Sequence, residues 1–188
     1  MRKAIYRDRG TVVDILTRAF DTNKSVNSVI KQDKHRVNRM KELMTYSFEV
    51  CFQFGEVFLS SVNKACALAL LPDQKRTTIK SLLWDARLIY KSIGITNVTK
   101  VLKRELEIRK MYPKEPMYHL WFGGVDPKYQ HQGIGTKLLN DLIQKAVSSG
   151  RSIFLETSTI ENLPLYQRCG FEIYQELELG YKLYLMRR

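Results

Sequence analysis

The feature that most constrains this chain is an apolar run followed at once by a glycine turn and an amphipathic helix pattern. The apolar run ends at Val125, and Asp126-Pro127 supplies turn residues. After Gly133 and Gly135, apolar residues recur with helical spacing until Ser148-Ser149-Gly150, where glycine permits the positive φ of a helix end. This order predicts an α/β protein in which a buried strand leads through glycines into a helix.

A glycine turn at a helix N-terminus is a candidate phosphate cradle. The first N–H groups of a helix lack partners within it, and the helix dipole adds partial positive charge there. The spacing argues against two common cradles. A dinucleotide fingerprint needs a third glycine where this chain has Leu138, and a Walker loop needs Gly-Lys-Ser/Thr where it has Gly135-Thr136-Lys137.

Two motifs carry a resemblance to a known family. The pattern Gln130-x-x-Gly133-x-Gly135, after a strand ending Val125-Asp-Pro, resembles motif A of the GNAT acyl-CoA-dependent N-acyltransferases. In that superfamily the backbone amides of this turn hold the pyrophosphate of coenzyme A. The later pattern Asn162-(x)3-Tyr166-(x)3-Gly170-Phe171 is also similar to the family, whose Asn contacts the cofactor and whose Tyr lies beside its sulfur. The resemblance covers residues 117–188.

The chain also departs from the family pattern. Where GNAT members often carry glycine and a basic residue, this chain has His131 and Gln132, so one positive charge toward the phosphates is absent. Thr136, one residue past the glycines, adds a hydroxyl donor to the turn.

The resemblance implies the GNAT acyl-CoA N-acyltransferase fold, a mixed central sheet flanked by helices, with acetyl-CoA (coenzyme A) as cofactor. We expect one N-acetyltransferase domain over residues 1–188, with the cofactor-binding core in 117–188 and acceptor-side helices in 11–54 and 75–111. The predicted cofactor-binding residues are Gly124, Val125, Gln130, His131, Gln132, Gly133, Ile134, Gly135, Thr136, Asn162 and Tyr166.

Acyl transfer to an amine requires a polarised carbonyl, a protonated leaving thiolate and a deprotonated amine. We expect a bulge at Gly123-Gly124 to free backbone donors, with Val125 N–H as the oxyanion donor. By resemblance, Tyr166 protonates the thiolate. The base is left open between Glu156 and Glu56. The predicted catalytic residues are therefore Tyr166, Glu156 and Val125, with no metal.

The rest of the chain is expected to alternate helices and strands. Periodicity indicates an extra helical hairpin before the cofactor strand, where family members often have a turn. The expected strands are 2–6, 56–62, 65–71, 172–179 and 181–186, and the expected helices are 11–20, one or two within 25–54, 75–93 and 97–111.

Composition limits the other functions. The net charge of +12 invites nucleic acid, but the basic residues are dispersed and accompany no nucleic-acid motif. No secretory signal or membrane-length apolar run is evident, and three scattered cysteines fit unpaired thiols, so we expect a soluble cytoplasmic protein, monomeric or homodimeric.

The acceptor is expected to be a small-molecule or peptide amine. A chain of this charge repels polycations unless its cleft is locally acidic, which Asp85, Glu105, Glu107 and Glu115 could provide. The alternative is a non-catalytic GNAT-like basic module that binds a partner or nucleic acid. The presence of both Asn162 and Tyr166 argues against it, because a degenerate site need keep neither.

Overall fold

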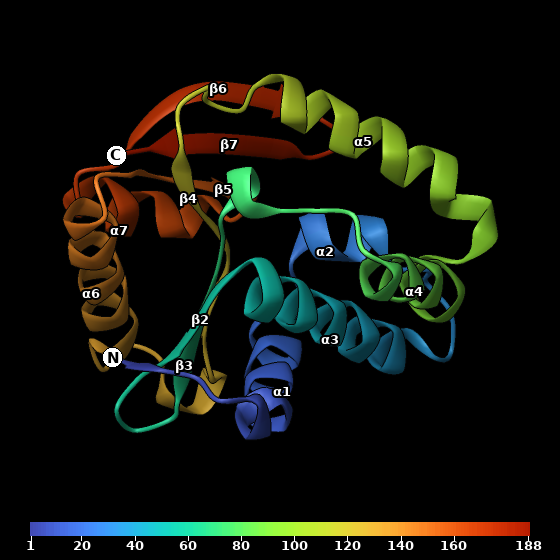
Figure 1. The fold of residues 1–188 in the computed structure, drawn as a ribbon, viewed down its shortest axis with the longest axis horizontal. Helices are drawn as coiled ribbons and strands as arrows, with labels where there is room; N and C mark the ends of the chain where they lie inside the picture. The colour runs from blue at the N-terminus through green and yellow to red at the C-terminus, as the bar shows by residue number, and fades with distance from the viewer.

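A seven-stranded mixed sheet forms the centre of the computed structural model, which describes residues 1–188 (Figure 1). The order is β1-β2-β3-β4-β5-β7-β6, and β4 and β5 are the parallel neighbours. The strands are β1 Arg2–Lys3, β2 Gly55–Leu59, β3 Ala65–Leu70, β4 Met117–Val125, β5 Ser152–Thr157, β6 Glu172–Glu178 and β7 Lys182–Arg187.

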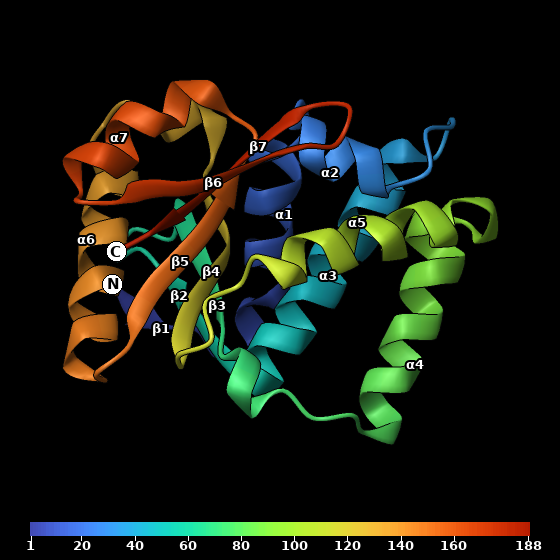
Figure 2. The same ribbon diagram turned by 90° about the horizontal axis from the view of Figure 1, so that it is seen from above.

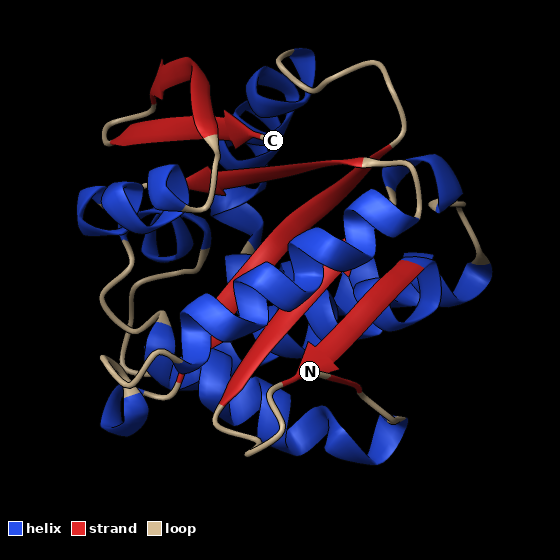
Figure 3. Ribbon diagram, turned by 90° about the vertical axis from the view of Figure 1, so that its left-hand side faces the viewer, coloured by secondary structure: helices blue, strands red, loops and turns tan.

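Helices cover both faces of this sheet (Figure 2). On one face lie α1–α5, and on the other lie α6 and α7; Figure 3 looks onto the α6 side, where that helix crosses in front of the strands. No helix is both long and apolar enough to cross a membrane. The helices are α1 Arg9–Ala19, α2 Lys24–Val29, α3 Arg36–Phe54, α4 Ile79–Leu88, α5 Val98–Lys110, α6 Ile134–Ser148 and α7 Leu163–Arg168.

The predicted fold class is confirmed, including two helices between β3 and the cofactor strand β4. The π turn η3 (Ile89–Ile93) follows α4, and Gly94, at φ +77°, breaks the helical path as predicted. The two helices cross at a steep angle instead of packing side by side (Figure 2). Residues of both helices, of α3 and of the sheet line a common cavity, described below.

A β-bulge interrupts the pairing of β3 with β4, but at a different position from the one predicted. Leu68 lies opposite Phe122 and Ala69 opposite Leu120, which leaves Trp121 as the extra residue. The prediction of a bulge at Gly123-Gly124 was therefore wrong, because both glycines are in regular register with β3.

Gly124 instead permits a close approach between β4 and helix α1. A Cβ on this residue would lie 3.0 Å from the Ala19 Cβ and 3.1 Å from Leu16 Cδ2. Real Cβ atoms rarely come so close to their neighbours, so a side chain here would push α1 away from the end of β4.

The bulge also changes which residues of β4 face each layer of helices. Before it, Tyr118 and Leu120 belong to the cluster under α6. After it, Phe122 belongs to the cluster under α1–α3, and Val125 packs on the α6 side. Since strand side chains alternate between faces, one extra residue reverses the alternation for the end of the strand.

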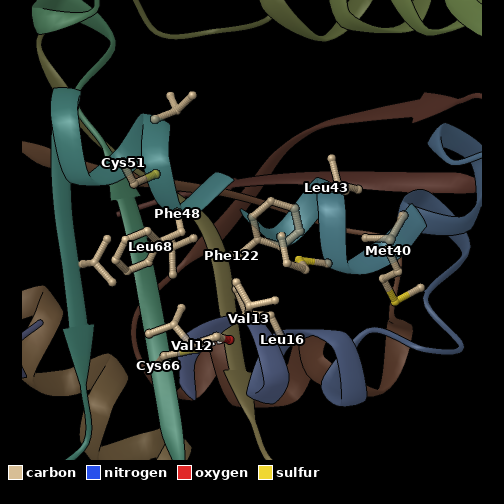
Figure 4. Close-up of a cluster of buried hydrophobic side chains, with 14 of the residues drawn as sticks. Val12, Val13, Leu16, Met40, Leu43, Phe48, Cys51, Cys66, Leu68 and Phe122 are labelled. Carbon is tan, nitrogen blue, oxygen red and sulfur yellow. Dashed lines mark hydrogen bonds between the residues drawn. The ribbon is translucent and has the colours of Figure 1, made fainter. Parts of the chain in front are cut away.

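The larger core cluster holds the acceptor-side helices to the sheet (Figure 4). Helix α3 contributes Phe48 and Met40, both fully buried, against Leu16 of α1 and Leu68 of β3. Phe52, one turn after Phe48, stacks on it with 5.4 Å between ring centroids but keeps 40% of its surface exposed.

Replacing Phe48 by alanine should lower the free energy of unfolding by about 3–5 kcal/mol, because it removes a fully buried ring and leaves a cavity. The matched change Phe52→Ala should cost about 1 kcal/mol, since this ring is already partly hydrated. Urea unfolding followed by circular dichroism measures both. Equal losses would show that α3 is not anchored through Phe48.

Candidate active site

The glycine turn before α6 has the backbone conformation expected of an anion cradle. Gly133 is the N-cap of α6 in the left-handed region, at φ +75°. His131, at φ +60°, also lies there, a conformation that favours the glycine that family members often have at this position. The first α6 N–H groups, on Ile134, Gly135 and Thr136, have no partner within the helix.

A cavity of about 930 Å³ opens at this turn, where β4 and β5 separate. Their pairing ends with Leu120 opposite Leu155. Ten of the eleven predicted cofactor-binding residues line the cavity, and Gln132, exposed on the outer side of the turn, does not: those lining it are Gly124, Val125, Gln130, His131, Gly133, Ile134, Gly135, Thr136, Asn162 and Tyr166.

The last residues of β4 present free backbone donors at this opening. Asp126 N–H donates to Lys64 O of the β3 side at 2.9 Å, so in an antiparallel ladder Gly124 also bonds toward β3. The N–H groups of Gly123 and Val125 consequently point to the other edge, which β5 has left. The expectation that Val125 offers a donor is thus supported by the ladder, although no bulge at the glycines is involved.

Gln130 connects the glycine turn to the end of β4. Its side-chain Nε2 donates to Val125 O at 3.4 Å, a long hydrogen bond. Gly135 fits closely against the same residue, since a Cβ on it would lie 2.9 Å from Val125 Cγ2. The strand end and the turn are therefore positioned as a unit.

A second cavity, of about 520 Å³, lies on the α1–α5 face between α3, α4, α5 and the sheet. Its walls are mostly apolar. It shares several lining residues with the first cavity, so the two meet under the end of β4; the shared residues are Phe20, Asn23, Leu120, Gly123, Ser158, Thr159, Asn162 and Tyr166.

Tyr166 stands at this junction. Its ring packs edge-on against Phe171 at 5.8 Å, and its hydroxyl has no hydrogen-bond partner in the protein. Desolvation, with a smaller contribution from Cys169, raises the pKa of Tyr166 to about 12. The phenol is therefore protonated at neutral pH and free to donate.

Glu156 belongs to the second cavity and is held by two neighbours. Tyr112 Oη donates to its Oε1 at 3.0 Å, and His119 Nε2 lies 3.4 Å from the same oxygen. Burial raises the pKa of Glu156, but the hydrogen bond and charge of His119, with Arg104 and Tyr112, outweigh it and leave the pKa lowered. The carboxylate is ionised at neutral pH.

His119 and Tyr112 were not singled out by the sequence. The His119 side chain is 4% exposed, and its Nδ1 atom is buried without a partner. Its ring lies 5.2 Å from that of Tyr112. Tyr112 comes from the segment after α5, forty-four residues from Glu156, and no local pattern announces that contact.

Glu56, the other candidate base, lies elsewhere. Its carboxylate accepts from the hydroxyl of Tyr118 and from Lys3 Nζ, the latter at 3.0 Å. Tyr118 faces α6, and Glu56 lines neither large cavity. The structure therefore excludes Glu56 as the base, because its position on β2 directs the carboxylate away from the point where the two cavities meet.

The acidic residues predicted in the α4–α5 insertion divide into two groups. Asp85 and Glu105 line the second cavity. Glu107 instead pairs with Lys110 at 2.6 Å on the exposed side of α5, and Glu115 lines neither cavity.

Comparisons with known proteins agree with this geometry. Residues 93–171 match the acetyltransferase (GNAT) family. A Corynebacterium glutamicum structure described as histone acetyltransferase HPA2 and related acetyltransferase aligns with a TM-score of 0.74 at 21% identity, over 99% of this chain and 93% of that one.

Two further structures align over the whole chain. The C-terminal condensation domain of Ebony, in complex with beta-alanyl-dopamine, has a TM-score of 0.68 at 12% identity, covering 100% of this chain and 96% of that one. A mosquito arylalkylamine N-acetyltransferase like 5b has a TM-score of 0.60 at 15% identity, covering 100% and 97%. At such identities the likeness establishes the fold.

The molecule therefore has the fold of the acyl-CoA N-acyltransferases. Its residues 93–171 match the GNAT acetyltransferase family, so the predicted resemblance to that superfamily is confirmed. Acyl transfer is the class of activity that family and fold support.

The lowered pKa of Glu156 predicts an acid-sensitive contribution to stability. A carboxyl group whose pKa is lower in the folded state stabilises the fold fully above its ordinary value of 4.5, and this stabilisation is lost as pH falls through the folded-state value. Glu156→Gln should therefore unfold with less dependence on pH between about pH 3 and 5 than the wild type does.

Urea unfolding at a series of pH values gives the free energy of unfolding of each protein. Subtracting the variant from the wild type at each pH removes the contribution of the other carboxylates, which both proteins share. Glu107→Gln, on the exposed side of α5, is the control and should follow the wild type. A Glu156→Gln curve parallel to the wild type would contradict the assignment of a favourable charge environment.

Proposed function

We propose that the protein is an acetyl-CoA-dependent N-acetyltransferase that acts on a primary amine of a small molecule or peptide by direct attack in a ternary complex. The observation that carries the proposal is the meeting of two cavities at Tyr166, one beginning at the glycine turn and the other on the acceptor face. A cofactor and an acceptor can enter from different sides and meet there.

Coenzyme A fits the first cavity by its chemistry. The unbonded N–H groups at the start of α6 suit its pyrophosphate, and Thr136 adds a hydroxyl donor. The pantetheine arm would then follow the gap between β4 and β5, where the N–H groups of Gly123 and Val125 are free to bind it. The net charge of +12 attracts a polyanionic cofactor and offsets the missing basic residue at Gln132.

The reaction forms an N–C bond and breaks the C–S bond of the thioester. Val125 N–H stabilises the negative charge that develops on the carbonyl oxygen. Tyr166 donates a hydrogen bond, and then its proton, to the departing thiolate. The excess amine proton restores the phenol, so the net transfer of that proton is from nitrogen to sulfur.

Glu156 receives a different proton, the one that the ammonium form of the acceptor must lose before it attacks, directly or through water, and later releases it to solvent. Its lowered pKa makes it a weak base but keeps it ionised, and the low-dielectric cavity strengthens its attraction for the ammonium group. Tyr112 and His119 hold the carboxylate in place.

Two other lines of support concern the substrate class and the compartment. The arylalkylamine N-acetyltransferase among the similar structures is named for an amine acceptor. Three buried, unpaired thiols, Cys51, Cys66 and Cys169, suit a reducing compartment such as the cytoplasm.

Gly133→Glu should weaken coenzyme A binding by at least about 100-fold, because a carboxylate about 5 Å from the pyrophosphate costs about 3 kcal/mol at an effective dielectric constant of 20. Gly133→Ala is the matched control. It carries the same cost of a left-handed backbone, about 1–2 kcal/mol, and its Cβ meets nothing within 4 Å. Calorimetric titration with coenzyme A compares them.

If the alanine and glutamate variants bind coenzyme A equally well, the turn is not the phosphate cradle. Failure of the wild-type protein to bind coenzyme A at millimolar concentration would refute the proposed function. Binding without thiol release for any amine, together with salt-dependent binding to RNA or DNA, would favour the non-catalytic module.

Tyr166→Phe should lower kcat by about 100-fold and leave the affinity for coenzyme A nearly unchanged, because only the proton donor is removed. Release of free thiol from acetyl-CoA measures kcat, and titration measures affinity. Tyr174→Phe serves as the control, since its hydroxyl donates to Met111 O away from both cavities. Full activity of the Tyr166 variant would remove this residue from the mechanism.

A further inference from the structure

The second cavity contains equal numbers of acidic and basic side chains, but the two kinds are not equally engaged. Three carboxylates and three cationic groups line it: Asp85, Glu105, Glu156, Lys75, Arg104 and Arg109. Although the whole chain is strongly basic, the formal charge of this lining is therefore close to zero.

Each carboxylate already has a partner in the protein. Tyr46 Oη donates to Asp85 Oδ1 at 2.7 Å. Glu105 pairs with Arg104, which also donates to Tyr181 Oη at 2.7 Å. Glu156 accepts from Tyr112. Each carboxylate therefore already accepts a hydrogen bond or ion pair from the protein, although only Glu105 is paired with a cationic side chain of the cavity.

Lys75 and Arg109, in contrast, have neither an ion pair nor a side-chain hydrogen bond. They come from different parts of the chain, Lys75 after β3 and Arg109 from the last turn of α5. Both are open to solvent, yet the cavity walls partly desolvate the lysine. Desolvation and then the positive charge of Arg109 lower the pKa of Lys75, while Asp85 and Glu105 act in the opposite direction, so both cations and these two carboxylates lie within electrostatic range of one another.

Lys75 lies at the end of the cavity away from the reaction point, and Arg109 lies nearer to Glu156. Arg109 precedes Tyr112 by one helical turn, and Tyr112 contacts both His119 and the carboxylate of Glu156. Lys75 follows β3, whose residue Leu70 is opposite His119. From His119 to Gly123 a strand rises about 13 Å, so Lys75 and the free β4 donors are separated by roughly 10–15 Å.

The wall between the two ends is apolar. The bulge places Trp121 on the same face of the sheet as Phe122, and Trp121 lines one side of the cavity. Leu102 and Leu106 of α5 line the other and remain 57% and 59% exposed. An acceptor with an apolar body would cover these leucines.

We propose that the acceptor is an elongated amino carboxylate, with its amine at Tyr166 and Glu156, an apolar middle, and its carboxylate bound by Lys75 and Arg109. This assignment rests on the proposed function. The span suits an ω-amino acid or a peptide of three or four residues, at about 3.3–3.6 Å per residue. A carboxylate suits the pair because the guanidinium fork binds it with two hydrogen bonds.

The experiment compares acceptors that differ only at the far end. Aminooctanoate and the tripeptide Leu-Leu-Leu are each paired with their primary amide, and thiol release from acetyl-CoA gives kcat and KM. The wild-type protein should favour each carboxylate by at least about 10-fold in kcat/KM, mainly through KM. In Lys75→Gln and Arg109→Gln the ratio of the two kcat/KM values should fall toward one.

Two variants serve as matched controls. Lys103→Gln lies on the same helix as Arg109, and Arg76→Gln follows Lys75 directly; neither residue lines the cavity. Both should keep the wild-type preference. Calorimetric binding of aminooctanoate and its amide to the coenzyme A complex gives a second readout that does not depend on turnover.

Equal use and equal binding of carboxylates and amides by the wild-type protein would overturn the inference, as would control variants that lose the preference. So would coenzyme A binding with no binding of either carboxylate. Each of these results is compatible with the proposed function, provided that some other amine causes the release of thiol from acetyl-CoA. Absence of coenzyme A binding, by contrast, refutes the proposed function itself.

Discussion

The separation of β4 from β5 is the constraint on which the candidate site depends. These strands pair in parallel up to Leu120 and Leu155, and beyond that point the antiparallel β7 continues to pair with β5. A strand edge left without a partner exposes backbone donors that require hydrogen bonds. Here the exposed edge lies between the two cavities. Its backbone N–H groups, which would destabilise the fold if they were buried without partners, are available to a ligand.

Packing on both faces fixes where the strands separate. Helix α1 approaches β4 so closely that residue 124 has no room for a side chain, and α6 packs on Val125 from the other face. The bulge at Trp121 reverses the alternation of β4 just before the gap and places two aromatic side chains toward the acceptor helices. The same irregularity therefore shapes both the strand end and the wall of the second cavity.

Local signals predicted most of the fold and the residues on the glycine-turn side of the first cavity. The glycine turn, the N-terminus of α6 and the four-residue spacing of Asn162 and Tyr166 each depend on neighbours in sequence, and ten of eleven cofactor-side candidates line one cavity. The bulge was misplaced because glycine permits an irregularity without requiring one. Trp121 is the bulged residue, a position set by packing on both faces of the sheet.

The second cavity was harder to predict because distant side chains make it. Glu56 and Glu156 look alike in sequence, and the face of the sheet on which each lies decides between them. The contact of Tyr112 with Glu156, and the burial of His119, depend on how the segment after α5 crosses β4. No periodicity in any one segment contains that information.

The first cavity was easier to predict than the second because the cofactor half and the acceptor half of the site would recognise their ligands in different ways. The cofactor half would rely on backbone N–H groups, whose positions follow from a turn and a helix start, so several side chains there can vary, as at His131 and Gln132, without changing the cradle. The acceptor half would rely on side chains from α3, α4, α5, β4 and β5 and on Lys75, where exchanging one charge alters which ligand fits. The resemblance of a chain to its family can therefore be recognised from the cofactor half of the site, while the identity of the acceptor depends on the side chains of the acceptor half. In this chain, we propose that the side chains lining the cavity, and above all the two unpaired cations, determine what it attracts, more than the net charge of +12 does.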